Sequence, residues 1–205
     1  MYNYPHKLLK LINEVSKLPG VGPKMAERIG LHIIKKDKNE NEYIDNFASV
    51  LQESKELTFC RECFNVSDFE ICPICADKER DGQIMCVVES AEEVITVERT
   101  GKFKGYYHVL QGLINPLNNM LPDNLRIKEM LERIKSRGGA IKEIILAINH
   151  SVEGDATSLY ISAMAKDLGY EMKISRLAKG LPTGSDIRYA DEITLGQAIV
   201  ERKEI

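Results

Sequence analysis

Apolar side chains recur every three or four positions near the start of the chain, which is the spacing of one face of an α-helix. One such helix is expected before the turn 18–22. A second begins at Pro23, a residue suited to the first helical position. A third covers 43–51, and we expect it to pack against neighbouring elements. The apolar positions of the first two are Leu8, Leu11, Ile12, Val15 and Leu18, then Ala26, Ile29 and Ile33.

From Gly82 onward the pattern changes to short apolar runs that alternate with helical spacing. One helix is expected to be capped by Asp123 and ended by Gly138 and Gly139. Strands that are apolar throughout favour a mostly parallel sheet with both faces covered, so the fold class is α/β. The expected strands are 84–88, 106–110, 144–148 and 172–177, and the other expected helices are 91–99 and 156–168.

Two Cys-x-x-Cys pairs lie between these regions, with eight residues separating them. Two tight turns with this spacing can present four thiolates to one tetrahedral ion, which predicts a structural Zn²⁺ site. The alternatives are two disulfides or cysteines that fill core space, but adjacent pairs of this kind are poor structural disulfides. Cys86 is read as a buried strand residue outside the site. The expected ligands are Cys60, Cys63, Cys72 and Cys75.

Charge is unevenly distributed along the 205 residues, although the formal net charge is only −3. Residues 1–36 hold seven Lys or Arg and two acidic residues, whereas 37–59 hold two basic and six acidic residues. A basic segment in a mildly acidic chain indicates a localised anionic partner. No apolar run approaches the roughly 18 residues that a membrane span needs. We therefore expect a cytoplasmic protein without a membrane partner.

The turn at 18–22 has the sequence Leu-Pro-Gly-Val-Gly and directly precedes the second helix. Gly20 and Gly22 can leave backbone N–H groups exposed beside the positive end of the helix dipole, which suits a phosphate that Lys24 could also neutralise. With Arg28, the segment resembles a helix-hairpin-helix, a module that binds DNA without sequence specificity. Met25 stands where that motif often has a small hydroxyl residue. The alternative is an ordinary helical hairpin with a Pro-Gly turn.

Polar and acidic residues follow two of the expected strands, at the sheet edge where ligands bind. Glu89 follows the first strand, and 149–155 follow the strand 144–148. This arrangement resembles the Toprim domain of topoisomerases and primases, which implies an acid after the first strand and an Asp-x-Asp after a later one. Glu89, Glu153, Gly154 and Asp155 match it in character. The Asp-x-Asp positions hold Asn149 and Ser151, which bind Mg²⁺ far less well than two carboxylates.

A solvated loop with carboxylates at a helix N-terminus explains Glu153 and Asp155 about as well as a retained site. The sequence also shows no Walker A pattern, so no ATPase activity is expected.

The complete order of motifs, ending with the segment 176–186, resembles the RecR family of bacterial recombination mediators. The resemblance covers essentially the whole chain. It implies a non-enzymatic, DNA-binding homo-oligomer, a ring-shaped tetramer, that acts with RecF and RecO in recombinational repair and helps to load recombinase at gaps. The expected parts are a helix-hairpin-helix domain at 1–53, a four-cysteine zinc finger at 57–78, a Toprim domain at 82–178 and a C-terminal segment at 179–205.

Two other functions remain open from the sequence. One is a small Mg²⁺-dependent nuclease or primase-like enzyme built on the Toprim domain, which the pair Asn149 and Ser151 argues against. The other is a protein-interaction adaptor whose hairpin packs against a neighbouring subunit.

Overall fold

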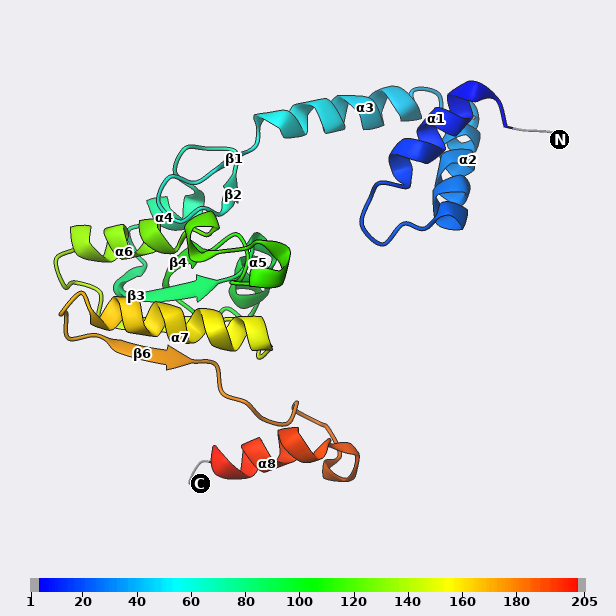
Figure 1. The fold of residues 1–205 in the computed structure, drawn as a ribbon. Helices are drawn as coiled ribbons and strands as arrows, with labels where there is room; N and C mark the ends of the chain where they lie inside the picture. Colours follow the sequence, from blue (N-terminus) through cyan, green and yellow to red (C-terminus); the bar gives the residue numbers. More distant parts are fainter. Residues whose placement is uncertain (1–3, 203–205) are drawn as a thin grey trace. The chain divides into compact units, whose positions relative to one another are not determined.

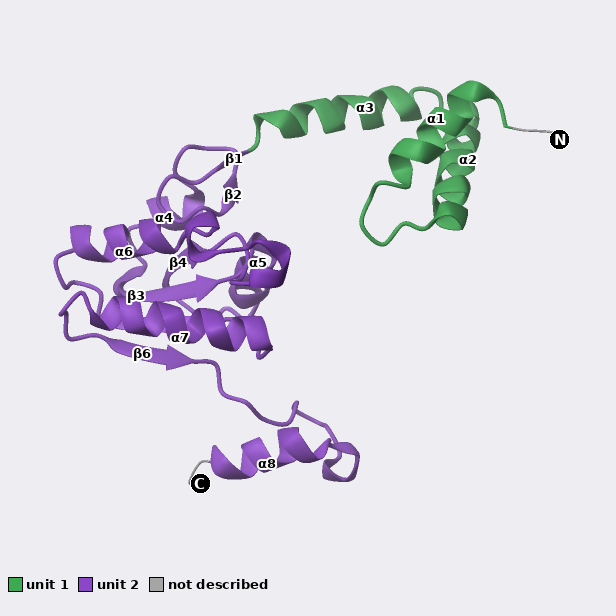
Figure 2. Ribbon diagram, in the orientation of Figure 1, with its two compact units in different colours: residues 1–57 green, residues 58–205 purple. Residues whose placement is uncertain are grey.

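The structure, a computed structural model, describes residues 4–202. The chain divides into two compact units, Met1–Leu57 and Thr58–Ile205 (Figure 2). No helix within the described residues is both long enough and apolar enough to cross a bilayer.

The first unit consists of helices (Figure 1). Helix α1 spans His6–Val15, α2 spans Pro23–Asn39 and α3 spans Tyr43–Glu53, followed by a 3₁₀ turn at Ser54–Glu56. Helices α1 and α2 pack closely because Gly30 has no side chain: a Cβ there would lie 3.0 Å from Ile12 Cγ1. Few residues of this unit are buried, and α1 and α2 pack through a small contact around Val15, Ala26, Gly30 and Ile33.

Helix α3 forms where its periodicity predicts, and its first turn contacts α2, where Ile44 N donates to Asp37 Oδ1 at 2.9 Å. The rest of its apolar face is not covered within the described part of the chain. None of its residues is buried. Phe47, Val50 and Leu51 are 48%, 62% and 54% exposed. The helical pattern identifies an apolar face, but it carries no information about whether another part of the same chain covers that face.

The second unit is built on a four-stranded parallel sheet in the order β4-β3-β5-β6. Three crossover helices connect the strands, as the alternating pattern predicts, and the α/β fold class is confirmed. The strands are β3 (Asp81–Val88), β4 (Gly105–Val109), β5 (Glu143–Ala147) and β6 (Lys173–Arg176), and the helices are α5 (Ala91–Arg99), α6 (Ile127–Ser136) and α7 (Val152–Lys166).

The two faces of the sheet are covered differently. On one face, residues of α6 and α7 such as Met130 and Ile161 pack on Val87 and Ile144. On the other, Val94 of α5 and side chains from the cysteine-rich segment pack on β3 and β4, and Cys86 lies here, 2% exposed. Cys86 is therefore a core residue as predicted, and burial raises the pKa of its thiol to about 12.

The remaining elements are short. The cysteine-rich segment, here called the zinc knuckle (residues 58–76), contains β1 (Thr58–Phe59), antiparallel β2 (Val66–Ser67) and α4 (Pro73–Ala76). Beyond β6 the chain forms a 3₁₀ turn at Ile187–Tyr189 and helix α8 (Glu192–Val200). Two more 3₁₀ turns, Pro116–Asn118 and Pro122–Asn124, precede α6.

Two helix starts differ from the sequence prediction. Asp123 does not cap α6; it lies in a 3₁₀ turn, and the helix begins at Ile127 after Leu125, which is extended and 2% exposed. The extended backbone that buries Leu125 is not helical, so α6 can begin only after this residue. Helix α7 begins at Val152, earlier than expected, because the Ser151 side chain accepts a hydrogen bond from Gly154 N and caps it.

His108 of β4 is a fully buried histidine beside α6. Its Nε2 lies 2.7 Å from the Arg126 carbonyl oxygen, an acceptor, so Nε2 carries the hydrogen of a neutral ring. Burial lowers the pKa of this imidazole to about 4, although the carbonyl contact opposes the shift and the nearby Arg133 adds to it. The ring is therefore uncharged at neutral pH.

This burial predicts acid sensitivity. The pKa of a histidine in an unfolded chain is about 6.5, so as pH falls below that value the unfolded state binds a proton that the folded state refuses until about pH 4. At pH 7 the neutral ring contributes nearly its full share to the free energy of unfolding. Lowering the pH from 7 to 5 should reduce that free energy by about 2 kcal/mol. Urea unfolding at both pH values measures it. In His108→Gln, whose amide can donate to the same carbonyl, that part of the pH dependence should disappear; an unchanged dependence would show that His108 does not cause it.

Candidate functional site

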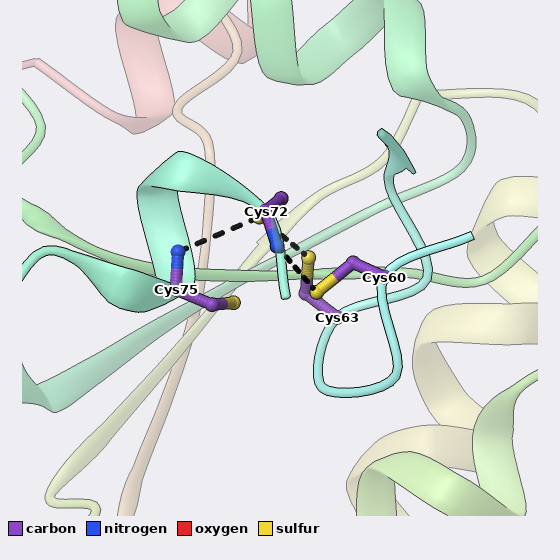
Figure 3. A group of neighbouring side chains, drawn as sticks. All are labelled: Cys60, Cys63, Cys72 and Cys75. Atoms are coloured by element: carbon purple, nitrogen blue, oxygen red, sulfur yellow. Dashed lines mark hydrogen bonds between the residues drawn. The ribbon is translucent and has the colours of Figure 1, made fainter. Parts of the chain in front are cut away.

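The four predicted ligand cysteines converge in the zinc knuckle (Figure 3). Cys60 and Cys63 lie on the turn that follows β1, and Cys72 and Cys75 lie at the start of α4. Pro73 occupies the first position of that short helix, where its missing N–H costs nothing. Phe64 adopts a φ of 61°, a left-handed turn that lets the chain reverse directly after Cys63. The antiparallel pair β1 and β2 closes the base of the turn.

The sulfur positions fit a tetrahedral ion. All four Sγ atoms lie within 4.8 Å of one another, and Cys63 Sγ and Cys72 Sγ are 3.6 Å apart. Thiolates bound to Zn²⁺ at about 2.3 Å in a tetrahedron lie about 3.8 Å from each other. Four sulfur ligands leave no position for water, so such an ion is structural and performs no chemistry.

Backbone N–H groups point at the sulfurs as they do around a bound thiolate. Cys72 N donates to Cys60 Sγ at 3.3 Å, and Cys75 N donates to Cys72 Sγ at 3.4 Å. Hydrogen bonds from Cys63 and Cys75 lower the pKa of the Cys72 thiol, whereas sharing with Cys72 raises that of Cys63. Without a metal ion the cluster therefore favours one thiolate, at Cys72, and a bound ion would have to displace protons from its neighbours.

The zinc knuckle is hydrogen-bonded to the sheet and belongs to the same compact unit. Val109 N donates to the Cys63 carbonyl at 2.8 Å, and Gln111 Nε2 donates to the Phe64 carbonyl at 2.6 Å. From the other side, Tyr106 Oη donates to the Asp77 carbonyl at 2.8 Å. The first two bonds attach the turn after Cys63 to the carboxyl end of β4, and the third ties the residue after α4 to the start of that strand.

The glycine turn of the first unit precedes α2 as predicted. Gly20 has a φ of +77°, a conformation that favours glycine, and Val21 N closes the turn on the Leu18 carbonyl at 3.1 Å. Gly22 instead has φ −75° and is extended as the N-cap of α2. A Cβ at Gly22 would meet no atom within 4 Å, so glycine there leaves the helix N-terminus open to an approaching group.

Lys24 and Arg28 are both exposed, one helical turn apart near the start of α2. Together with Gly22, Pro23 and Met25 they line one surface hollow. Within the described residues neither side chain makes a salt bridge. Two unpaired cations beside open N–H groups form an arrangement that can hold an anion such as phosphate.

A second candidate site lies at the carboxyl ends of β3 and β5, here called the strand-end pocket. Glu89, Asn149, Ser151 and Glu153 line this hollow of about 440 Å³. Asp155 does not: it points to β6, where it forms an ion pair with Arg176 at 2.5 Å. Two of the three predicted acids are therefore brought together, and the third is held elsewhere.

The strand-end pocket is chemically weak as a cation site. Burial, followed by the nearby Glu93 charge, raises the pKa of Glu89, and a hydrogen bond with the Asn149 side chain opposes the shift. Ser151 is engaged as the α7 cap at 3.1 Å from Gly154 N. The pocket thus offers two carboxylates with neutral amides and a hydroxyl, and it lacks the Asp-x-Asp carboxylates that the Toprim resemblance implies.

Sequence reasoning missed the loop that closes this pocket. Asn115 and Asn118 line it, and Asn115 Nδ2 lies 3.4 Å from Glu153 Oε1. The only signal was a turn-rich Asn-Pro-Leu-Asn-Asn stretch. Gly154 has a packing role as well: a Cβ there would lie 2.0 Å from the Asn149 carbonyl oxygen, so α7 can start against β5 only with glycine at this position.

These parts define a class of protein that combines a helix-hairpin-helix, a four-cysteine zinc finger and a Toprim domain. Family comparisons match each part: the RecR helix-hairpin-helix at 8–54, the RecR four-cysteine zinc finger domain at 57–77, the Toprim domain at 83–178 and the RecR C-terminal region at 180–203.

Full-length relatives agree with these matches. The chain is 44% identical over 203 residues to the recombination protein RecR of Acidothermus cellulolyticus, with 98% of both chains covered. It is 44% identical over 202 residues to that of Moorella thermoacetica, again with 98% of both covered, and 42% identical over 206 residues to that of Natranaerobius thermophilus, with all of both covered. The chain belongs to the RecR family of recombination proteins, and its cofactor is the zinc of a four-cysteine finger.

The zinc site generates a direct prediction. The double variant Cys63→Ser, Cys72→Ser should lose the one zinc ion per chain, because two ligands cannot hold it, and metal analysis of the purified protein measures this. Structural zinc contributes about 10 kcal/mol in small peptide modules, so the zinc knuckle should also become sensitive to protease. Cys86→Ala is the matched control: it should keep the zinc and cost only about 1 kcal/mol of core packing. Zinc retained in the double variant would contradict the assignment.

Proposed function

We propose that this protein is a non-enzymatic recombination mediator that binds DNA through the hairpin of its first unit. The observation that carries the proposal is the pair Lys24 and Arg28, which are exposed beside the open glycine turn and form no salt bridge with any residue of the described range 4–202. Such a site recognises backbone phosphate, which every sequence offers, and lacks the base-reading side chains of a recognition helix. Because Gly20 and Gly22 have no side chains, a phosphate can approach the backbone of the turn closely, and the positive end of the α2 dipole adds to the attraction.

The partners proposed are DNA, single- or double-stranded, together with RecF and RecO, with which the protein would help to load recombinase at gaps. Support comes from family membership, which the whole chain shares. We further propose a homo-oligomer, a ring-shaped tetramer. The apolar side chains that α3 leaves exposed, Phe47, Val50 and Leu51, are consistent with an additional protein contact. A cytoplasmic location accompanies this role.

Absence of catalysis is part of the proposal. The two positions that carry metal-binding carboxylates in Toprim enzymes hold Asn149 and Ser151, and Ser151 is occupied as a helix cap. The second candidate function, a small Mg²⁺-dependent nuclease or primase-like enzyme, is favoured only by Glu89 and Glu153, which share the strand-end pocket. Two carboxylates without an Asp-x-Asp make a poor Mg²⁺ site.

DNA binding by the hairpin is tested with Lys24→Ala, Arg28→Ala. Each lost phosphate contact should reduce the slope of log affinity against log salt by about 0.9 on duplex DNA, so the double variant should bind more weakly and with a slope smaller by about 2. Fluorescence titrations at several salt concentrations on two unrelated sequences measure it. The loss should be the same on both sequences, because the contacts are to phosphate.

The matched control is Lys7→Ala, Lys10→Ala, which removes the same charge from exposed positions of α1 in the same unit. It should change the slope much less. If the hairpin variant is folded and binds with unchanged affinity and slope, the hairpin is a protein contact, and the adaptor function replaces the proposal.

Catalytic silence is tested on labelled single- and double-stranded DNA with Mg²⁺. We expect no cleavage or synthesis above background. Adding carboxylates with Asn149→Asp, Ser151→Asp should increase Mg²⁺ binding measurably, and aspartate is also a good helix N-cap, so α7 should remain. Cleavage abolished by Glu89→Gln but kept in Glu92→Gln, an exposed acid of α5, would establish the enzyme; cleavage equal in both would indicate a contaminating nuclease.

A further inference from the structure

The free edge of the sheet at β4 is covered by side chains and by the zinc knuckle. Carbonyl and N–H groups on this edge have no neighbouring strand, so each needs another partner. The Gly105 carbonyl accepts from Arg80 at 2.9 Å, and Val109 N donates to the Cys63 carbonyl at 2.8 Å. Between them, the Tyr107 carbonyl accepts from Arg133 Nη1 at 2.6 Å. Each of the three outward-facing residues of β4, Gly105, Tyr107 and Val109, thus has one backbone group paired.

Arg133 is the unusual member of this set because it is almost completely buried, with 8% of the residue exposed. It projects from α6 and reaches both the sheet and the metal site. Its Nη2 lies 3.8 Å from Cys75 Sγ, and its Nε lies 3.6 Å from Glu62 Oε2, a side chain 41% exposed. The Nε hydrogen has no hydrogen-bond partner among the described residues.

A buried guanidinium is costly unless negative charge compensates it. Glu62 alone is a distant and partly hydrated partner. Four thiolates around Zn²⁺ carry a formal charge of −2, and one of them, Cys75, faces the guanidinium. Groups that donate to metal ligands orient them and raise metal affinity. The zinc–thiolate centre therefore supplies the charge that the burial of Arg133 requires.

We propose that Arg133 is a positioning residue that balances the charge of the zinc–thiolate centre and, through the Tyr107 carbonyl, fastens the zinc knuckle to the edge of β4. The Nη2 group of the guanidinium donates to the Cys75 sulfur, and the Nη1 group donates to the Tyr107 carbonyl of the sheet. Zinc retention and the closure of the β4 edge are then coupled, because both depend on the same side chain.

The test uses full-length, zinc-loaded protein with Arg133→Met, which keeps an unbranched apolar stem but removes the fork and the charge. Zinc transfer to a chromogenic chelator should be at least about tenfold faster than in wild type. Amide exchange at Val109, whose N–H donates to the Cys63 carbonyl, should also accelerate, and the thiolate-to-metal absorption of the Co²⁺-substituted protein should shift. The matched control, Arg61→Met, removes an equal charge from the zinc knuckle itself, where Arg61 pairs with Glu70 at the surface and is 68% exposed. It should resemble wild type.

The proposal is overturned if Arg133→Met retains wild-type zinc transfer and edge protection, or if Arg61→Met accelerates transfer equally, since general electrostatics would then explain the effect. Should Arg133→Met fail to fold, Arg133→Gln decides. Glutamine can still donate to a carbonyl but carries no charge, so faster zinc transfer supports the proposal, and a wild-type rate refutes it.

Discussion

The need to satisfy the backbone at the β4 edge organises the second unit. A parallel sheet with an exposed edge pairs readily with other chains, and proteins cover such edges with loops, helices or charged side chains. Here a metal-dependent turn and two arginines do so, and the turn depends on four sulfurs for its shape. The zinc finger is therefore part of the architecture of the sheet, although its sequence signature looks like that of a separate module.

Much of this could be predicted from local patterns. The cysteine spacing, the glycine turn before Pro23 and the alternation of strands and helices each report on neighbouring residues, and each led to the element that the structure contains. The role of Arg133 could not be predicted in this way. It lies 58 residues from Cys75, and nothing in the spacing around it distinguishes it from Arg126 and Arg137, which flank the same helix.

The prediction errors have related physical causes. The start of α6 was misplaced because the burial of Leu125, a tertiary effect, overrides the capping potential of Asp123. The Toprim resemblance groups Asp155 with Glu153, but the structure separates them. Once Ser151 caps the helix, residues two apart project in different directions, and only Glu153 faces the strand-end pocket. Local periodicity predicts which residues share a face of a helix, whereas tertiary packing decides which of those faces is buried.

The glycine at 154 has one more consequence. Because no side chain could stand between the first turn of α7 and the Asn149 carbonyl, the end of β5 and the start of the helix are pressed into direct contact. The floor of the strand-end pocket thus has little freedom to rearrange. Whatever occupies that hollow, a partner's side chain or a weakly held ion, meets a shape that already exists and loses little affinity to reorganising this floor.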